Sequence, residues 1–502
     1  MSTWRSIVFL TFQHQQKIDR FAEMDKKRWV VRYFILAGIS SVLAIKLYLL
    51  LFIVDFTVGI YSFLTSFIIF YYFFNSFIRF RDPYLYAKDI VLSEDNKPLV
   101  SMIVPVKNEE DNIRNCVQSC INSTYSKKEI IIVNDGSTDK TSEILDEMRR
   151  EEPNIKIIHL SKSLGKKQAT EAGCQIAKGD IFLFMDSDCD IYSDAVEKAV
   201  KIFKSDRRIG AVTGHARIRN AEKGNLLEKI QDVWFDGQFR ILKGAETSFS
   251  SLTCCSGALS IFRREAVAPH IHAWAHDRFL GMENFKFCTD RRLTAYVLGA
   301  KPSDVLKNNN LSAANNNHST TNNNAMPTLL QTGKDDINTM KSSSDPDVKN
   351  PRKGQRAAWK LVYSPSVRVN AGVPTTLPSL LRQQIRWRKS FIRSLFATGG
   401  IFWRRPLGIA IVYYVTLGLK LLRPFIIIKA VIFLPLTGDI VTALMYLVGA
   451  LYSGMLYGID VRLRHPGYKF WIYRPIMTFL STFVISWLVI YAAITIRKEA
   501  WR

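Results

Sequence analysis

The chain has 502 residues, of which 48% are hydrophobic and 12% aromatic, and the aromatic residues are concentrated in the first 80 and the last 100. This composition excludes a wholly soluble enzyme, a small disulfide-stapled domain and a disordered chain, which leaves a soluble domain between membrane segments. The net charge is +24, from 68 Lys and Arg against 44 Asp and Glu. Much of that charge flanks apolar stretches, and no nucleic-acid-binding motif accompanies it. We therefore expect the lipid bilayer, and no nucleic acid, among the partners.

The N-terminal part predicts a membrane anchor. Residues 1–30 are basic, and residues 31–80 contain two apolar stretches, Val31–Val54 and Val58–Ile78, each long enough to cross a bilayer. Positive charge lies on both sides of this pair and none lies between the two stretches. The positive-inside rule then places the N-terminus and the following domain in the cytoplasm, in a multi-pass protein of the cell (plasma) membrane. Lys46, inside the first stretch, should snorkel or face a polar cavity.

Residues 99–300 alternate short apolar strands with amphipathic helices. This βαβ series predicts an α/β fold with a mostly parallel sheet and helices on both faces. Ligands of such sheets bind beyond the carboxyl ends of the strands. Three predicted strands lead into Lys107–Glu109, Asp135–Ser137 and Asp186–Asp188, so we expect a site there. The predicted strands are Val100–Pro105, Glu129–Val133, Ile155–Leu160 and Ile181–Met185, and the predicted helices are Asp111–Ile121, Thr141–Arg150 and Lys166–Ala177.

The remaining chain divides into three parts. Residues 303–356 contain three Asn runs and few apolar residues, which predicts a disordered cytosolic insertion. Residues 357–404 complete the catalytic domain, with a predicted strand at Ala357–Tyr363 and a basic amphipathic helix at Leu377–Phe396 suited to the membrane interface. Residues 405–502 hold three apolar stretches, at Leu407–Leu434, Ile440–Tyr457 and Ile476–Ile494. We expect the first two to span the membrane and the third, basic at both ends, to lie along the interface.

All seven cysteines lie between Cys116 and Cys288. Their number is odd, and they form no C-x-x-C pair with histidine partners. Reduced thiols in a cytosolic domain are the natural expectation.

Four motifs suggest chemistry. Asp186-Ser187-Asp188 follows an apolar strand and could bind a hard divalent cation, Mg²⁺ or Mn²⁺, that neutralises a diphosphate leaving group. Asp135, in Asn134–Asp139, could accept hydrogen bonds from a nucleobase or ribose. Lys166, after Gly165, could offer its charge to a phosphate. Each also has an ordinary alternative, namely a polar turn, a turn before a helix cap, and a solvated helix start.

The fourth motif is Gln383-Gln384-Ile385-Arg386-Trp387 on the predicted amphipathic helix. Gln383 and Arg386 share a helix face, and Trp387 lies beside them. Arg can bind phosphate oxygens through two parallel hydrogen bonds, and an indole is a flat platform for a sugar ring. An interfacial helix with basic and aromatic anchors is the alternative.

In this order, the motifs resemble the D, DxD, D, QxxRW signature of processive, membrane-embedded family 2 glycosyltransferases. Asp135, Asp186–Asp188, Asp290 and Gln383–Trp387 stand at the matching positions. Within that family, the chain most resembles hyaluronan synthases, through the four segments Arg278–Gly281, Thr289–Thr294, Gln383–Ser390 and Cys254–Ala258. Two residues depart from their pattern, because Thr289 replaces the first Asp of G-D-D and Ala258 replaces a Pro.

The resemblance implies a GT-A (nucleotide-diphospho-sugar transferase) domain inserted between transmembrane helices. It implies a metal-dependent, inverting hexosyltransferase that transfers sugars from UDP-sugars, UDP-GlcNAc and with it UDP-GlcA, to a growing extracellular polysaccharide. Asp290 would be the catalytic base, and Arg386 would stabilise the departing UDP. The other implied roles are donor binding by Glu109, Asp135, Lys166, Asp186 and Arg386, metal binding by Asp188 and Asp186, and acceptor binding by Cys254, Gln383 and Trp387.

Three alternatives stay open at this stage. One is a chitin- or cellulose-like synthase that uses a single UDP-sugar, and another is a transferase that adds single sugars to a lipid-linked (glycolipid) acceptor. The third, from a different class, is a membrane scaffold or lipid-binding protein with a degenerate domain. The donors required, the product length and the presence of UDP binding distinguish them. No obligate protein partner is inferred.

Overall fold

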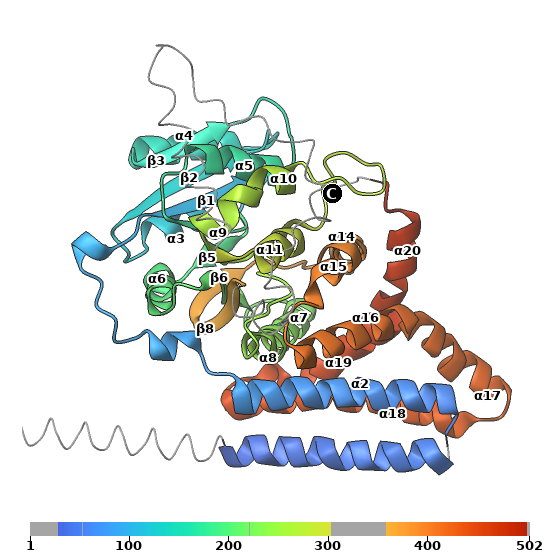
Figure 1. Ribbon diagram of the computed structural model, residues 1–502. Helices are drawn as coiled ribbons and strands as arrows, with labels where there is room; N and C mark the ends of the chain where they lie inside the picture. The colour runs from blue at the N-terminus through green and yellow to red at the C-terminus, as the bar shows by residue number, and fades with distance from the viewer. Residues whose placement is uncertain (1–28, 53, 220, 303–357, 499–502) are drawn as a thin grey trace, which may run out of the picture.

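The computed structural model describes residues 29–52, 54–219, 221–302 and 358–498. The expectations for the basic N-terminus before residue 29 and for the Asn-rich segment 303–356 lie outside these residues. Figure 1 shows a sheet flanked by helices in one part of the molecule, and long apolar helices lying side by side in the other. The part with the sheet contains the strands whose ends carry the predicted site residues.

The sheet has eight strands in the order β3-β2-β1-β4-β7-β6-β8-β5. Its first half is parallel: β1 (Val100–Val106) pairs with β2 (Lys128–Asn134) and β4 (Ile181–Phe184), and β2 pairs with β3 (Ile155–His159). All seven residues of β1 are buried, as expected for a central strand with both faces covered. The four strands predicted from the sequence are confirmed to within one residue at each end.

Three helices connect the parallel strands, as the βαβ pattern predicted. They are α3 (Ile113–Ile121), α4 (Thr141–Glu151) and α5 (Lys166–Ile176). Helix α5 packs directly on the sheet at Gly173, where a Cβ atom would lie 2.6 Å from Ile103. This contact fixes the N-terminus of α5, and with it Lys166, relative to β1.

The second half of the sheet is mixed, which the sequence did not predict. The long strands β6 (Ile209–Ile218) and β8 (Lys360–Ala371) run parallel to each other. Two short strands, β7 (Ser260–Arg263) and β5 (Cys189–Ile191), pair antiparallel with their neighbours. Neither short strand is joined to a parallel neighbour through a helix. The βαβ pattern of the sequence therefore did not predict these two strands. The resulting mixed α/β sheet is the GT-A arrangement expected from the motifs.

Within the described residues, four helices are long and apolar enough to cross a membrane: Trp29–Phe52, Phe56–Tyr86, Ile440–Arg464 and Lys469–Ile494. The first two match the expected N-terminal pair, and the third matches one expected C-terminal span. The fourth contains the stretch that we expected at the interface. In Figure 1, α2 (Phe56–Phe74) and α18 (Ile440–Arg464) lie beside the N-terminal helix.

The expected span Leu407–Leu434 is not among these four helices. It consists of α16 (Leu407–Ile427) and a π-helical segment, Ile428–Phe433. It also carries Lys420, Arg423 and Lys429, and charged side chains are costly in a bilayer core.

Lys46 is bound to a neighbouring helix. Its Nζ donates hydrogen bonds to the hydroxyl oxygens of Ser62 (2.8 Å) and Ser66 (2.7 Å) on α2. Of the two expectations for this residue, the structure confirms the polar surroundings. A lysine between two apolar helices therefore joins them through hydrogen bonds.

The helix that carries the QxxRW motif, α14 (Leu377–Ala397), is joined to the sheet domain through buried Asp277. The Asp277 carboxylate accepts hydrogen bonds from Arg393 on α14 (2.7 Å) and from Arg292 on α11, Thr289–Gly299 (3.2 Å). It also lies 3.5 Å from the Nζ of Lys167 on α5. The side chains of Asp277 and Lys167 are each only 2% exposed. One carboxylate therefore links three helices.

We expect Asp277→Asn to destabilise the protein strongly, because it leaves buried Lys167 and Arg393 without their counter-charge. Removing one partner of a buried pair typically costs about 3–5 kcal/mol. The thermal unfolding midpoint of the detergent-solubilised protein measures the effect. Glu283→Gln, in the same loop, is the matched control, because its ion pair with Arg278 is exposed and such pairs contribute roughly 0–1 kcal/mol. Equal midpoints for the two variants would contradict the prediction.

Candidate active site

The carboxyl ends of β1, β2 and β4 meet at one edge of the sheet. Asp135, the first residue after β2, donates its backbone N–H to the carbonyl of Val106, the last residue of β1 (2.8 Å). Glu109 follows β1 and Asp186 follows β4. The edge at which the sequence placed a site therefore carries three of the predicted side chains.

Asp135 organises the loop that precedes α5. Its carboxylate accepts hydrogen bonds from the hydroxyl of Ser163 (2.8 Å) and from the backbone N–H groups of Leu164 (2.6 Å) and Gly165 (3.0 Å). Gly165 has a φ of +103°, a conformation that favours glycine. Asp135 is buried, and its carboxylate sets where α5 begins. Its predicted role in donor binding stays a prediction.

Lys166, the first residue of α5, brings two carboxylates together. Its Nζ forms an ion pair with Asp186 and lies 3.8 Å from Oδ1 of Asp290. Burial alone would lower the pKa of Lys166, but the negative charges of Asp186, Asp290 and Asp188 outweigh burial and raise it above its ordinary value. The ammonium group therefore stays charged and compensates the repulsion between the two acids.

Asp290 lies in the first turn of α11. Its Oδ2 accepts a hydrogen bond from the backbone N–H of Gly257 (3.1 Å), and its Oδ1 accepts one from the hydroxyl of Thr289 (3.0 Å). Thr289 is the residue that departs from the family pattern. Here it donates a hydrogen bond to the catalytic candidate, where an Asp would add a second negative charge.

Gly257 is a functional residue that sequence reasoning noted only as part of a similar segment. A Cβ atom on it would lie 2.8 Å from Oδ2 of Asp290 and 2.9 Å from Oδ2 of Asp186. Any side chain would therefore push the two carboxylates apart. The absence of a Cβ at this position is what allows them to converge.

Asp188 has surroundings suited to a cation. Burial, followed by the negative charges of Asp186 and Glu109, raises the pKa of Asp188 to about 6. Its backbone carbonyl accepts hydrogen bonds from the N–H of Gly372 (3.0 Å) and from Arg219 (3.1 Å), which hold the loop in place. Carboxylate oxygens gathered without enough positive charge are the donor set that hard divalent cations prefer. Asp186 and Asp188 therefore fit the predicted Mg²⁺ or Mn²⁺.

Cys254 lies three residues before Gly257 in the chain. Burial raises the pKa of its thiol, and the positive charges of Arg291 and Lys243 oppose that rise. Its backbone carbonyl accepts a hydrogen bond from Lys243. All seven cysteines are free, as expected for reduced thiols.

The QxxRW motif packs between two helices. Helix α14 contacts α11, which carries Asp290. Trp387 stacks on Trp234 of α7 (Leu226–Gly237), with ring centroids 5.7 Å apart and planes inclined by 28°. Trp387 remains 37% exposed, so the pair forms a partly open aromatic surface. The side-chain oxygen Oε1 of Gln383 is buried and has no hydrogen-bond partner within the described residues. Arg386 is on the same helix. No motif in the sequence pointed to Trp234.

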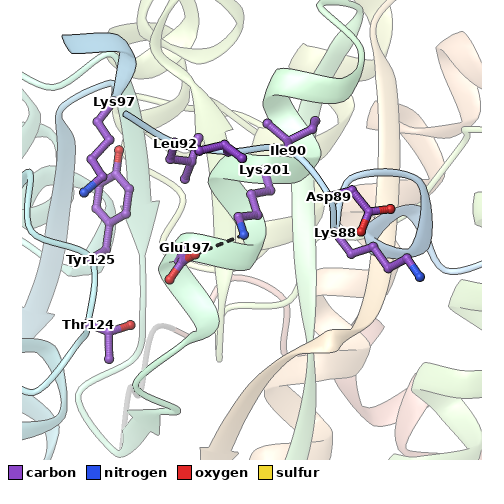
Figure 2. A pocket seen from close by; sticks show the side chains of 10 residues that line it. Lys88, Asp89, Ile90, Leu92, Lys97, Thr124, Tyr125, Glu197 and Lys201 are labelled. Atoms are coloured by element: carbon purple, nitrogen blue, oxygen red, sulfur yellow. Dashed lines mark ion pairs between the residues drawn. The ribbon is translucent and has the colours of Figure 1, made fainter. Parts of the chain in front are cut away.

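A cavity of about 340 Å³ lies away from these residues, between the segment Lys88–Leu92 and α6 (Ala195–Ser205). Figure 2 shows its lining side chains, with Lys201 paired to Glu197. Lys97 is paired in turn with Glu94. The cavity contains none of the predicted site residues, and these two cations already have carboxylate partners.

Comparison with known proteins gives the following findings. Residues 101–270 match the family model "Glycosyl transferase family 2". The chain is 26% identical over 410 residues to a hyaluronan synthase of Streptococcus pyogenes, and the aligned region covers 80% of this chain and 82% of that protein. It is also 31% identical over 197 residues to a poly-beta-1,6-N-acetyl-D-glucosamine synthase of Staphylococcus aureus, which covers 39% of this chain and 46% of that protein.

Two solved structures are also similar in outline. One is a mannosyltransferase from Pyrobaculum calidifontis in complex with GDP-Man and Mn²⁺, at 16% identity and a TM-score of 0.46, covering 88% of this chain and 99% of that one. The other is S. aureus TarS in complex with UDP, at 14% identity and a TM-score of 0.38, covering 76% and 91%. At such scores neither likeness bears on the activity of this chain.

The matched domain covers the strands that deliver Asp135 and Asp186, and the relatives that match most of the chain are hyaluronan synthases by name. The convergent carboxylates, the QxxRW helix and the flanking apolar helices agree with that match. The chain is a glycosyltransferase that carries a family 2 domain in a GT-A fold.

Proposed function

We propose that this protein is a processive synthase that transfers sugars from UDP-sugars to a growing extracellular polysaccharide, with a hyaluronan-like product made from UDP-GlcNAc and UDP-GlcA. The observation that carries the proposal is the convergence of Lys166, Asp186 and Asp290 over Gly257, beside the QxxRW helix. The flanking apolar helices support a multi-pass protein of the cell membrane, with the catalytic domain and N-terminus in the cytoplasm and the bilayer as its lipid partner.

The donor would bind at the carboxyl edge of the sheet. Asp186 and Asp188 would hold Mg²⁺ or Mn²⁺, which when bound neutralises the charge that develops on the UDP leaving group. Glu109 and Asp135 would contact the uridine. Lys166 and Arg386 would face the diphosphate, and Arg386 would stabilise it as it departs.

Asp290 would act as the general base. Its carboxylate takes the proton from an acceptor hydroxyl, the hydroxyl oxygen attacks the anomeric carbon, and the bond to UDP breaks with its electron pair leaving on UDP. One displacement inverts the anomeric centre. Trp387, supported by Trp234, would stack on the acceptor sugar, and the unpaired Oε1 of Gln383 would accept a sugar hydroxyl.

A cationic region behind the site favours an acidic polymer. Arg388 of α14 has a buried Nε without a hydrogen-bond partner among the described residues. Burial first, and then the positive charges of Arg423 and Arg291, lower the pKa of Arg388 to about 10. Enclosed positive charge is costly unless an anion accompanies it. The carboxylate of a uronic acid would supply one, whereas a neutral chitin- or cellulose-like chain would not.

A one-donor synthase is the second candidate. It is favoured by the partial similarity to the poly-beta-1,6-N-acetyl-D-glucosamine synthase, which is confined to 39% of this chain. The two candidates differ in the donors that elongation requires.

We expect long product only when purified protein receives both UDP-GlcNAc and UDP-GlcA with Mg²⁺ or Mn²⁺. Radiolabel on either sugar should enter one polymer, and a hyaluronan-specific lyase should degrade it. EDTA should abolish incorporation. Polymer made from UDP-GlcNAc alone would favour the one-donor synthase, and single-sugar products on lipid would contradict processivity. A protein that neither binds UDP nor transfers sugar would support the scaffold alternative.

Asp290→Asn should lower transfer by roughly 10²–10⁴-fold, the usual contribution of a positioned general base, while UDP affinity stays close to wild type. Asp188→Asn should instead weaken metal-dependent UDP binding first. Both quantities are measured on each variant from matched preparations. Near-normal turnover in folded Asp290→Asn would end the assignment of the base.

Arg388→Gln should shorten the polymer without lowering UDP affinity or the rate of the first transfer. The variant removes a half-buried charge whose Nε has no hydrogen-bond partner among the described residues, so its thermal stability should not fall. Product length on a gel and single-turnover transfer provide the two measurements, with exposed Arg404→Gln as the matched control. Unchanged product length would argue that the polymer does not use this region.

A further inference from the structure

A second group of metal-type ligands lies on the outer surface, between α5 and α10 (Ile271–Ala275). Glu171 of α5 faces His272 and His276, with Oε1 2.8 Å from Nδ1 of His272 and Oε2 3.1 Å from Nε2 of His276. One ligand atom from each residue lies within 4.8 Å of the others. Figure 1 shows the two helices side by side.

The spacing of the histidines suits shared ligation. His272 and His276 are four residues apart, so their rings project from one side of α10, and the ring centroids are 4.6 Å apart. Trp274, between them in sequence, points the other way: it is buried, and its Nε1 donates a hydrogen bond to the carbonyl of Thr289 (2.8 Å). The outer side of α10 thus holds imidazoles, while the inner side contacts the residue next to Asp290.

The second ring nitrogen of His276 has a partner of its own. Its Nδ1 lies 3.1 Å from the side-chain oxygen of Asn284. When Nδ1 carries a proton that this oxygen accepts, the lone pair of Nε2 is available to a cation beside the carboxylate of Glu171. Metal-binding histidines are commonly oriented in this way, by an oxygen that accepts from the nitrogen not bound to the metal.

We propose that Glu171, His272 and His276 form a binding site for a divalent ion of the Zn²⁺ class, separate from the catalytic metal site. Two imidazoles and one carboxylate match the ligands of zinc sites with an open fourth position. Tetrahedral bonds of about 2.0–2.1 Å place ligand atoms roughly 3.3 Å apart, so the present contacts need only a small expansion. Mg²⁺ prefers oxygen ligands and should not compete.

Such an ion would join α5 and α10, two helices that each position a different residue of the active site. Helix α5 begins with Lys166, and α10 leads through Trp274 and Thr289 to Asp290. The ion would therefore restrain the relative position of the cation and the base. Its effect should appear as an increase in thermal stability that is separate from catalysis.

The test uses the full-length protein in detergent, without a polyhistidine tag, stripped with EDTA and held in excess Mg²⁺. Calorimetric titration with Zn²⁺ should give one equivalent of bound ion that is absent or at least roughly tenfold weaker in Glu171→Gln, His272→Gln and His276→Gln. Asn284→Gly, which tolerates the positive φ at this position, should weaken binding by about 10–100-fold. Co²⁺ in place of Zn²⁺ should give visible absorption bands of a low-coordinate site.

His270→Gln is the matched control, since this histidine stacks on Tyr296 outside the cluster, and it should bind Zn²⁺ like wild type. His272 is 67% exposed, so its replacement should fold even if Glu171→Gln does not. Equal Zn²⁺ affinity in wild type and His272→Gln would overturn the proposal. So would a wild type that takes up no Zn²⁺ under these conditions.

Discussion

Two carboxylates that face the same small volume repel each other, and Asp186 and Asp290 do so across a glycine. Lys166 is the charge that makes this arrangement stable, since its ammonium group is paired with one acid and lies 3.8 Å from the other. The rest of the domain serves to hold that ammonium in place. Asp135 fixes the loop before α5, Gly173 allows α5 to touch the sheet, and the start of α5 then delivers Lys166 to the strand edge.

Asp290 and the pair Asp186 and Asp188 are held by different sets of hydrogen bonds. Asp290 receives hydrogen bonds from Gly257 and Thr289 on a helix start, so its carboxylate is held at a fixed position. Asp186 and Asp188 lie in a loop between two strands, and Arg219 and Gly372 tether the backbone of that loop. In the proposed mechanism, the first support suits a base that meets one hydroxyl, and the second suits a pair that holds an ion.

Much of this was predictable because the signals are local. Strands β1 to β4, the helices between them and the polar residues at their ends follow from alternating apolar segments, and motif order then pointed to the family. The short antiparallel strands β5 and β7 were missed because three or four residues carry no periodicity and because, unlike the equally short β4, neither is a continuous apolar run. Gly257 and Trp234 were missed because their roles depend on what other segments bring near them. Among the described residues, the helix Lys469–Ile494 is long and apolar enough to cross a membrane although its flanks are basic, whereas the stretch Leu407–Leu434, with three basic residues inside it, is not among the candidate spans.

Asp277 couples the positions of three helices to one another. Because one buried carboxylate holds α5, α11 and α14 together, the platform on which a sugar would rest cannot shift without pulling on the helices of Lys166 and Asp290. A processive enzyme must advance its product by one unit after each bond is made. With these three helices joined through one carboxylate, the displacement in the proposed reaction would fall to the polymer, which would slide over the aromatic surface while the reacting groups keep their register.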